Sequence, residues 1–127
     1  MDPPETLYDA VGGASFFDLL VGRFYEGVAT DDVLRPLYPE NLGPPRRHLS
    51  LFLAQYWGGP PAYDEARGEP RLRLRHIPFA IGARERDRWL LHMRAAVASL
   101  DPPDEVAGPL LEYFEMAADA LRNREDG

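Results

Sequence analysis

The sequence predicts an all-α protein that forms one domain over residues 1–127, and three observations support this prediction. The length of 127 residues lies within the roughly 100 to 150 residues that fill one hydrophobic core. The chain is 45% hydrophobic and 11% aromatic, which excludes a disordered or low-complexity chain. Apolar residues recur at three- and four-residue steps, which is the spacing of a buried helix face. We therefore expect about four principal helices and some short ones.

The first long helix is predicted over residues 13–29, where the apolar stripe consists of Phe16, Phe17, Leu20, Val21, Phe24, Tyr25 and Val28. After it, Asp31 and Asp32 are typical capping residues for a short helical piece that Pro39 ends. Residues 41–45 contain a glycine and two prolines and predict a linker.

A second principal helix follows the linker and ends at Gly58-Gly59-Pro60; its stripe consists of Leu49, Phe52, Leu53, Tyr56 and Trp57. Residues 58–70 are rich in glycine, proline and charge and predict a long loop of the kind that is usually functional or mobile. The next run, residues 71–76, alternates and by itself favours a strand. No other segment alternates, so a strand here would have no partner, and we interpret the run as a short helix that ends before Pro78.

Two further helices are predicted in the C-terminal third. Residues 85–100 carry Trp89, Met93, Ala96, Val97 and Leu100 at helical spacing and stop at Asp101-Pro102-Pro103. The last helix is expected to begin at Pro109, since proline suits a first helical position, with a stripe of Leu110, Phe114, Ala117 and Leu121. Residues 104–107 are interpreted as a separate turn.

Charge and composition exclude several classes of protein. The net charge of −7 and the pI near 4.9 argue against a nucleic-acid partner, because phosphate backbones select basic surfaces. No window approaches the roughly 18 apolar residues that span a bilayer, and the first residues do not resemble a signal peptide, so we expect a cytoplasmic protein without a membrane partner. Without cysteine there is no disulfide and no thiolate ligand, so any metal is held by other side chains or by a prosthetic group.

The three histidines offer few arrangements for chemistry, and no Ser-His-Asp set, phosphate-binding glycine loop or His-x-x-x-His pair is present. His48 lies at the polar edge of its helix and His92 lies off its apolar stripe, which predicts solvated or boundary positions. His76 differs because Leu72 precedes it at helical spacing and apolar residues follow it. The residue pattern leaves two interpretations of His76 open, a core histidine with a hydrogen-bond partner and a metal ligand.

Three large polar aromatic residues lie on predicted helical stripes: Tyr25, Tyr38 and Trp89. A buried phenol or indole usually finds a hydrogen-bond partner, so each is by default a core residue. If all three instead face one interior space, they form a pocket with hydrogen-bond donors for a polar ligand.

From Leu7 to Arg122 the chain resembles the truncated haemoglobins, and within them the group II branch. The segments that carry the resemblance are Tyr8-Asp9-Ala10-Val11-Gly12-Gly13, Arg23-Phe24-Tyr25, Leu37-Tyr38-Pro39-Glu40, Phe52-Leu53-Ala54-Gln55-Tyr56-Trp57-Gly58-Gly59-Pro60, Arg71-Leu72-Arg73-Leu74-Arg75-His76-Ile77-Pro78-Phe79 and Glu85-Arg86-Asp87-Arg88-Trp89-Leu90. The resemblance implies a truncated globin fold, in which two helix pairs pack crosswise as a two-on-two sandwich around haem.

The resemblance also implies roles for individual residues. His76 is the expected proximal ligand of a haem b iron, with a backbone carbonyl one turn earlier, that of Leu72, accepting from its other ring nitrogen. Tyr25, Tyr38 and Trp89 are the expected distal donors, since Pro44-Pro45 stands where vertebrate globins carry a distal histidine. The residues expected to line the haem pocket or hold its propionates are Leu49, Phe52, Tyr63, Leu72, Arg73, Arg75, Phe79, Arg47 and His48. For each polar residue of this set, an exposed position in solvent without contact to haem is an equally good interpretation.

The function implied by the resemblance is tight binding of O₂, and of NO, CO or other diatomic ligands, by a monomer or homodimer. NO dioxygenation or peroxidase-like reduction is a further expected activity that requires a separate reductase, because no flavin or nicotinamide site fits in this length. The alternative is a cofactor-free helical module that binds a partner or an apolar ligand through the same stripes.

Overall fold

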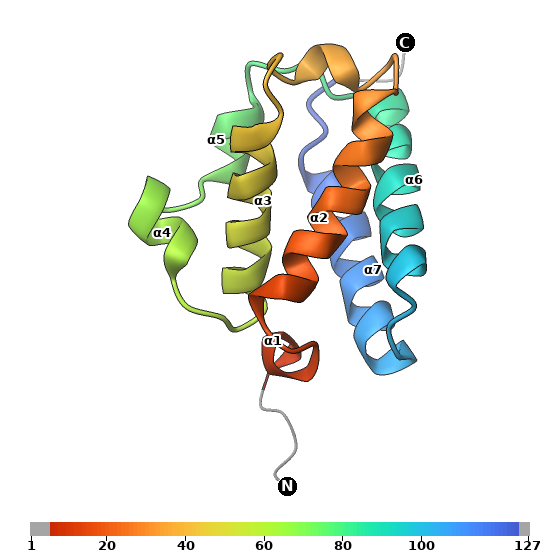
Figure 1. Cartoon of the computed structure of the whole chain (residues 1–127). Helices are drawn as coiled ribbons and strands as arrows, with labels where there is room; N and C mark the ends of the chain where they lie inside the picture. Colours follow the sequence, from red (N-terminus) through yellow and green to blue (C-terminus); the bar gives the residue numbers. More distant parts are fainter. Residues whose placement is uncertain (1–5, 125–127) are drawn as a thin grey trace, which may run out of the picture.

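The computed structural model describes residues 6–124 and shows an all-helical chain without strands in that range (Figure 1). The α-helices are α1 (Leu7–Ala10), α2 (Ala14–Ala29), α3 (Gly43–Tyr56), α4 (Ala62–Arg67), α5 (Leu72–His76), α6 (Ala83–Leu100) and α7 (Asp104–Ala120), and a 3₁₀ helix, η1, covers Arg35–Leu37. No helix in the described part of the chain is long and apolar enough to cross a membrane. The expectation of an all-α fold is confirmed.

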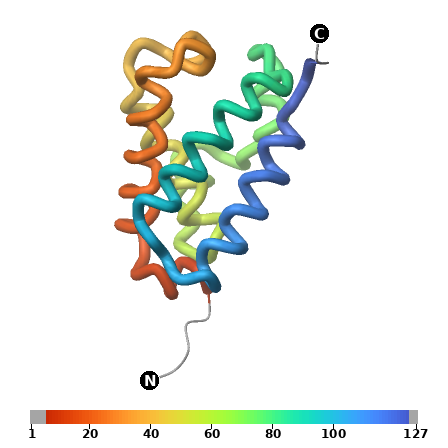
Figure 2. The backbone as a smooth tube through the Cα atoms, turned by 90° about the vertical axis from the view of Figure 1, so that its right-hand side faces the viewer, coloured from red at the N-terminus to blue at the C-terminus, as the bar shows by residue number. Residues whose placement is uncertain are grey.

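The long helices form two pairs that enclose one core. Helix α2 packs against α3 and α6, α6 packs against α7, and α4 packs against α3 at the edge of the molecule. Figure 2 shows α6 and α7 side by side and inclined to α2. This is the two-on-two arrangement that the sequence predicted.

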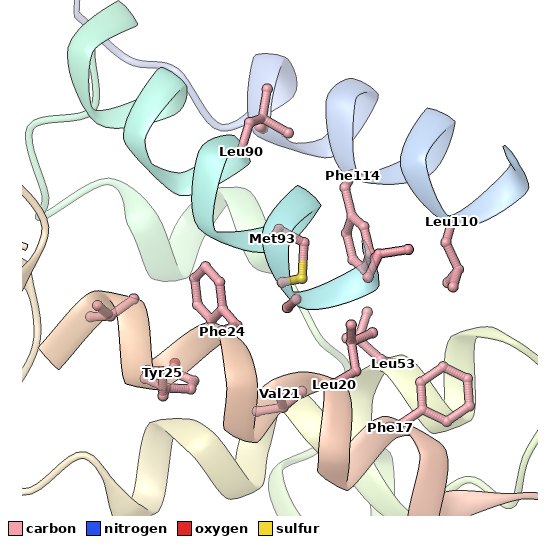
Figure 3. Close-up of a cluster of buried hydrophobic side chains, with 14 of the residues drawn as sticks. Phe17, Leu20, Val21, Phe24, Tyr25, Leu53, Leu90, Met93, Leu110 and Phe114 are labelled. Carbon is pink, nitrogen blue, oxygen red and sulfur yellow. The ribbon is translucent and has the colours of Figure 1, made fainter. Parts of the chain in front are cut away.

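The core forms because α2 carries apolar side chains at helical spacing along most of its length. Phe17, Leu20 and Phe24 of α2 are completely buried, as are Met93 of α6 and Leu110 of α7. Figure 3 shows these side chains pointing toward one another between the helix pairs. Burial of a large apolar side chain stabilises the fold by about 1.5–3 kcal/mol, so this cluster holds α2 against the C-terminal helices.

The alternating run is helical, as predicted: α5 covers Leu72–His76 and ends before Pro78. The chain enters α5 through Arg71, which adopts a left-handed conformation with φ 44°. The guanidinium of Arg75 then donates to the carbonyls of Pro70 (2.8 Å) and Arg67 (3.1 Å). These bonds hold the turn before α5 and fix the direction in which its residues point.

Two segments expected to be irregular are helical. Residues 41–45 are not a linker throughout, because α3 begins at Gly43, where the two prolines occupy the first turn and need no amide hydrogen. The loop expected over 58–70 contains α4. The Gln55 side chain holds α4 to α3 by donating to Asp64 Oδ1 (3.0 Å) and accepting from the Asp64 amide (3.0 Å).

The expected start of the last helix is also wrong. Helix α7 begins at Asp104 and continues through Pro109, so residues 104–107 are not a separate turn. A proline in a helix interior removes one backbone hydrogen bond. Val106 is buried in the core at 5% exposure, and its burial favours extending the helix to residues that precede Pro109.

Candidate functional site

The structure contains a cavity of about 520 Å³ with mainly apolar walls, a size typical of sites for small molecules and cofactors. Its walls come from α2, α3, α4, α5, α6, α7 and the segment around η1. The residues expected at the site that line the cavity are Tyr25, Tyr38, His48, Leu49, Phe52, Tyr63, Leu72, Arg75, His76, Phe79 and Trp89. Arg47 and Arg73 do not line it, and both are exposed.

His76 is the last residue of α5, and its imidazole is fixed by one hydrogen bond. Its Nδ1 lies 2.6 Å from the carbonyl oxygen of Leu72, the contact expected from the sequence. A carbonyl oxygen only accepts, so Nδ1 carries a proton, and Nε2 is the ring nitrogen that can offer a lone pair to a metal. His76 therefore presents a cavity-lining imidazole whose tautomer leaves Nε2 available as a ligand for a metal.

The connection after His76 is braced by Asn123, a residue that the sequence analysis did not single out. Its side-chain Nδ2 donates to the carbonyls of His76 (3.2 Å) and Phe79 (2.7 Å), and its Oδ1 accepts from the Ile81 amide (2.8 Å). Asn123 thereby links the chain after α7 to both ends of the segment between α5 and α6.

Tyr25, Tyr38 and Trp89 meet at the cavity, although they come from α2, the end of η1 and α6. The rings of Tyr25 and Tyr38 lie edge to face, with centroids 5.6 Å apart. The Tyr25 hydroxyl and the Trp89 indole N–H both donate to the Tyr38 oxygen. Because this oxygen accepts both bonds, the proton of Tyr38 remains to be donated into the cavity.

Both phenols stay protonated at neutral pH. Burial raises the pKa of Tyr25 well above its usual value, and its interactions with Tyr38 raise it further. Burial also raises the pKa of Tyr38 to about 12, although the hydrogen bonds from Trp89 and Tyr25 act in the opposite direction. The cluster is therefore a set of uncharged donors.

A polar rim lies at the side of the cavity that α3, α4 and α5 form. His48 is half-buried, and its Nδ1 accepts from the Arg67 guanidinium at 3.0 Å. Burial lowers the pKa of His48, and the positive charges of Arg67, Arg47 and Arg75 lower it further. Arg67, which the sequence analysis did not single out, lines the cavity together with Arg75.

Asp31 forms a buried polar cluster next to the three aromatic donors. Its Oδ1 accepts from the amides of Val33 (2.8 Å) and Leu34 (3.1 Å), so Asp31 caps the turn that leads to η1, although the N-cap residue of η1 itself is Leu34. Its Oδ2 accepts from Arg88 Nε (2.9 Å) and His92 Nε2 (2.6 Å). Burial by itself would raise the pKa of Asp31, but the bonds from His92, the two amides and Arg88 lower it far below its usual range.

The structure tests the positions expected for His92 and for the apolar face of α7. The side chain of His92 is 14% exposed, so its expected boundary position is confirmed, but its link to Asp31 was not foreseen. Phe114, Ala117 and Leu121 were expected to pack in the core, and they also line the cavity. Helical spacing identifies the inward face of a helix, and it does not distinguish a packed core from a cavity wall.

Comparison with known proteins shows similarity over nearly the whole chain. The sequence model of the family described as bacterial-like globin matches residues 6–123. Group 2 truncated hemoglobin YjbI of Bacillus subtilis (strain 168) is 37% identical over 119 residues, which cover 94% of this chain and 89% of that protein.

Solved structures show the same similarity. A thermostable hemoglobin from the actinobacterium Thermobifida fusca is 59% identical, with a TM-score of 0.91 over 93% of this chain and 97% of that one. A truncated oxygen-avid haemoglobin from Bacillus subtilis is 37% identical, with a TM-score of 0.89 over 94% of this chain and 100% of that one.

Proposed function

Because this chain belongs to the bacterial-like globins, as a group II truncated haemoglobin, we propose that it holds haem b in the cavity described above and binds O₂ there. A haem cofactor follows from the family. The identity of the haem as haem b, the roles of individual residues and the binding of NO and CO at the same place are parts of the proposal.

The observation that carries the proposal is the fixed imidazole of His76. Its Nδ1 is held by the Leu72 carbonyl at 2.6 Å, which leaves the lone pair of Nε2 for the iron. Haem proteins commonly use one imidazole nitrogen as the ligand, while a hydrogen bond from the other nitrogen sets the tautomer and the ring direction. The apolar walls of the cavity suit a porphyrin ring, so the residues present fit the group.

Haem iron would supply the centre at which a diatomic ligand binds, and the chain's residues would control how tightly that ligand is held. O₂ held at ferrous haem would carry partial negative charge, and Tyr25, Tyr38 and Trp89 line the cavity as uncharged donors that could stabilise it. A charge-assisted hydrogen bond contributes roughly 1 to 3 kcal/mol in such a site. We therefore expect slow release of O₂, which agrees with the description of the relative from Bacillus subtilis as oxygen-avid. Slow release argues against a role in simple oxygen transport.

The absorption spectrum of the purified protein tests this function. We expect one haem per chain, an intense Soret band that shifts reversibly with O₂, and a pyridine haemochrome spectrum of haem b. A colourless protein that folds and takes up no added haem would favour the cofactor-free helical module instead. Another haem type in the haemochrome assay would correct the cofactor and leave O₂ binding intact.

The polar rim predicts a modest effect on haem retention. His48→Ala removes a cavity-lining side chain and the partner of Arg67, and we expect haem to be released up to about fivefold faster, because partly exposed polar contacts contribute roughly 0.2–1 kcal/mol. The measurement is haem transfer to an excess of an apoglobin acceptor. Arg73→Ala is the matched control, since Arg73 is exposed and does not line the cavity. Equal rates of haem release for the two variants would indicate that His48 is a solvated residue that does not hold haem.

A further inference from the structure

Asp31 divides its two carboxylate oxygens between two parts of the fold. Oδ1 accepts from the amides of Val33 and Leu34, which belong to the segment that leads to Tyr38. Oδ2 accepts from Arg88 and His92, which belong to α6, the helix that carries Trp89. The Asp31 side chain is 1% exposed, so water does not replace these bonds. One buried carboxylate thus joins the element of Tyr38 to the element of Trp89.

The segment from Asp31 to Glu40 is braced internally, so that its position at Asp31 is transmitted to Tyr38. Backbone bonds run from the Arg35 amide to the Asp31 carbonyl (2.8 Å) and from the Tyr38 amide to the Arg35 carbonyl (3.2 Å). The Arg35 guanidinium also donates to the carbonyls of Pro39 (3.0 Å) and Glu40 (2.8 Å). A shift of this segment relative to α6 therefore moves the Tyr38 hydroxyl relative to the Trp89 indole.

The two α6 residues that bind Asp31 are also neighbours of the distal donors. Arg88 directly precedes Trp89, and His92 follows one turn later. The His92 ring also packs tightly against α2 at Gly27, where an added Cβ would overlap the ring. His92 is therefore held between α2, which carries Tyr25, and α6, which carries Trp89.

A capping role alone does not account for this arrangement. A cap needs one side-chain oxygen, and asparagine serves as well as aspartate at such positions. A buried carboxylate with cationic partners is weak evidence for stability, because its desolvation offsets much of the attraction. The second oxygen of Asp31 and its two partners on α6 therefore call for a separate explanation.

We propose that Asp31 is a positioning residue that, through Arg88 and His92, holds Tyr38 and Trp89 in register and thereby slows the release of O₂. This inference rests on the proposed function. The hydrogen bond from Trp89 to Tyr38 and the donor directions toward a ligand depend on the separation of the two elements, since hydrogen bonds weaken steeply as their angles depart from linearity. Asp31 contacts no ligand in this scheme and acts through the distal donors.

Asp31→Asn tests the proposal selectively. The amide oxygen of asparagine can still accept from Val33 and Leu34, while its NH₂ group faces Arg88, which only donates, and His92, whose Nε2 would have to give up its proton to accept. In the haem-loaded protein we expect O₂ to dissociate about 3- to 10-fold faster and CO less than about 2-fold faster, because a displaced donor loses part of a charge-assisted bond. Glu115→Gln is the matched control, since Glu115 pairs with Arg94 of α6 in an exposed position at 3.9 Å.

Two further measurements distinguish the positioning of the distal donors from a general loosening of the fold. In a Trp89→Phe background, Asp31→Asn is expected to change O₂ release less than about 2-fold, because coupled sites are not additive. In the CO-bound protein, the indole N–H resonance of Trp89 should shift in Asp31→Asn. The resonance of Trp57, whose Nε1 has no hydrogen-bond partner among the described residues, is the internal reference and should stay in place.

Arg88→Gln provides a second variant if Asp31→Asn does not retain haem, because the Arg88 side chain is 44% exposed and its replacement leaves the Asp31 side chain unchanged. It is expected to accelerate O₂ release in the same direction. Rates within twofold of wild type for the folded variants, or equal acceleration with and without the Trp89 indole, would overturn the positioning role. If the wild type itself binds no O₂, the proposed function fails and this inference fails with it.

Discussion

His76→Ala is expected to abolish stable haem retention. The variant removes the imidazole whose Nε2 is oriented by the bond from Nδ1 to the Leu72 carbonyl. Losing a hydrogen-bond partner behind a metal ligand typically costs about 10- to 100-fold in metal affinity, so losing the ligand itself should cost more. Because haem binds the folded chain, weaker binding also lowers the free energy of unfolding of the loaded protein.

The measurement combines haem stoichiometry, the Soret spectrum and thermal unfolding of His76→Ala. The matched control is His48→Ala, which removes another imidazole that lines the same cavity and is expected to keep haem. His76→Gly offers a further check, since added imidazole should fill the space and restore part of the wild-type spectrum. Wild-type retention and spectrum in His76→Ala would refute the assignment of the proximal ligand.

Trp89→Phe is expected to speed O₂ release by roughly 10- to 150-fold. The indole N–H, which donates to the Tyr38 oxygen in this structure, is expected to donate to bound O₂ instead, and this charge-assisted hydrogen bond is worth about 1.5–3 kcal/mol. The substitution keeps an aromatic ring in contact with Phe24 and Phe114, whose centroids lie 5.3 Å and 5.8 Å from the indole. Bound CO carries less negative charge on its outer atom and should respond less. The measurement is stopped-flow dissociation of both ligands.

The comparison of the two gases decides what the Trp89 indole does. Similar acceleration of O₂ and CO release would indicate a steric gate and refute the hydrogen-bonding role, while the haem assignment would stand. Tyr38→Phe is the companion variant, for which we expect a smaller effect than for Trp89→Phe. The Tyr38 oxygen accepts from both Tyr25 and Trp89, so its removal frees two donors that can hold the ligand between them.

The spacing of apolar residues predicted the helices well where the same residues pack in the core. The stripe over residues 13–29 became α2, and the alternating run at 71–76 became a helix because a single strand would have left its backbone groups unpaired. The errors lie at proline-rich boundaries. Pro44 and Pro45 begin α3 rather than separate two helices, and Pro109 lies inside α7, because the burial of Val106 extends that helix toward its start.

The helical class and the family could be predicted from the sequence, because helical periodicity and family motifs are properties of short segments. The same motifs identified His76, Tyr25, Tyr38 and Trp89. Which polar residues reach the cavity depends on how the helices pack, and the sequence did not predict it. Arg75 lines it and Arg73 does not, since residues two apart on a helix point in different directions.

The long-range hydrogen bonds that brace the site also depend on how the helices pack. Asp31 meets Arg88 and His92 across 57 and 61 residues of chain, and Asn123 meets His76 across 47. The local sequence around Asp31 accounts for its cap and says nothing of its second oxygen. Such contacts depend on how whole helices pack, and a pattern that repeats every three or four residues carries no information about partners that far away.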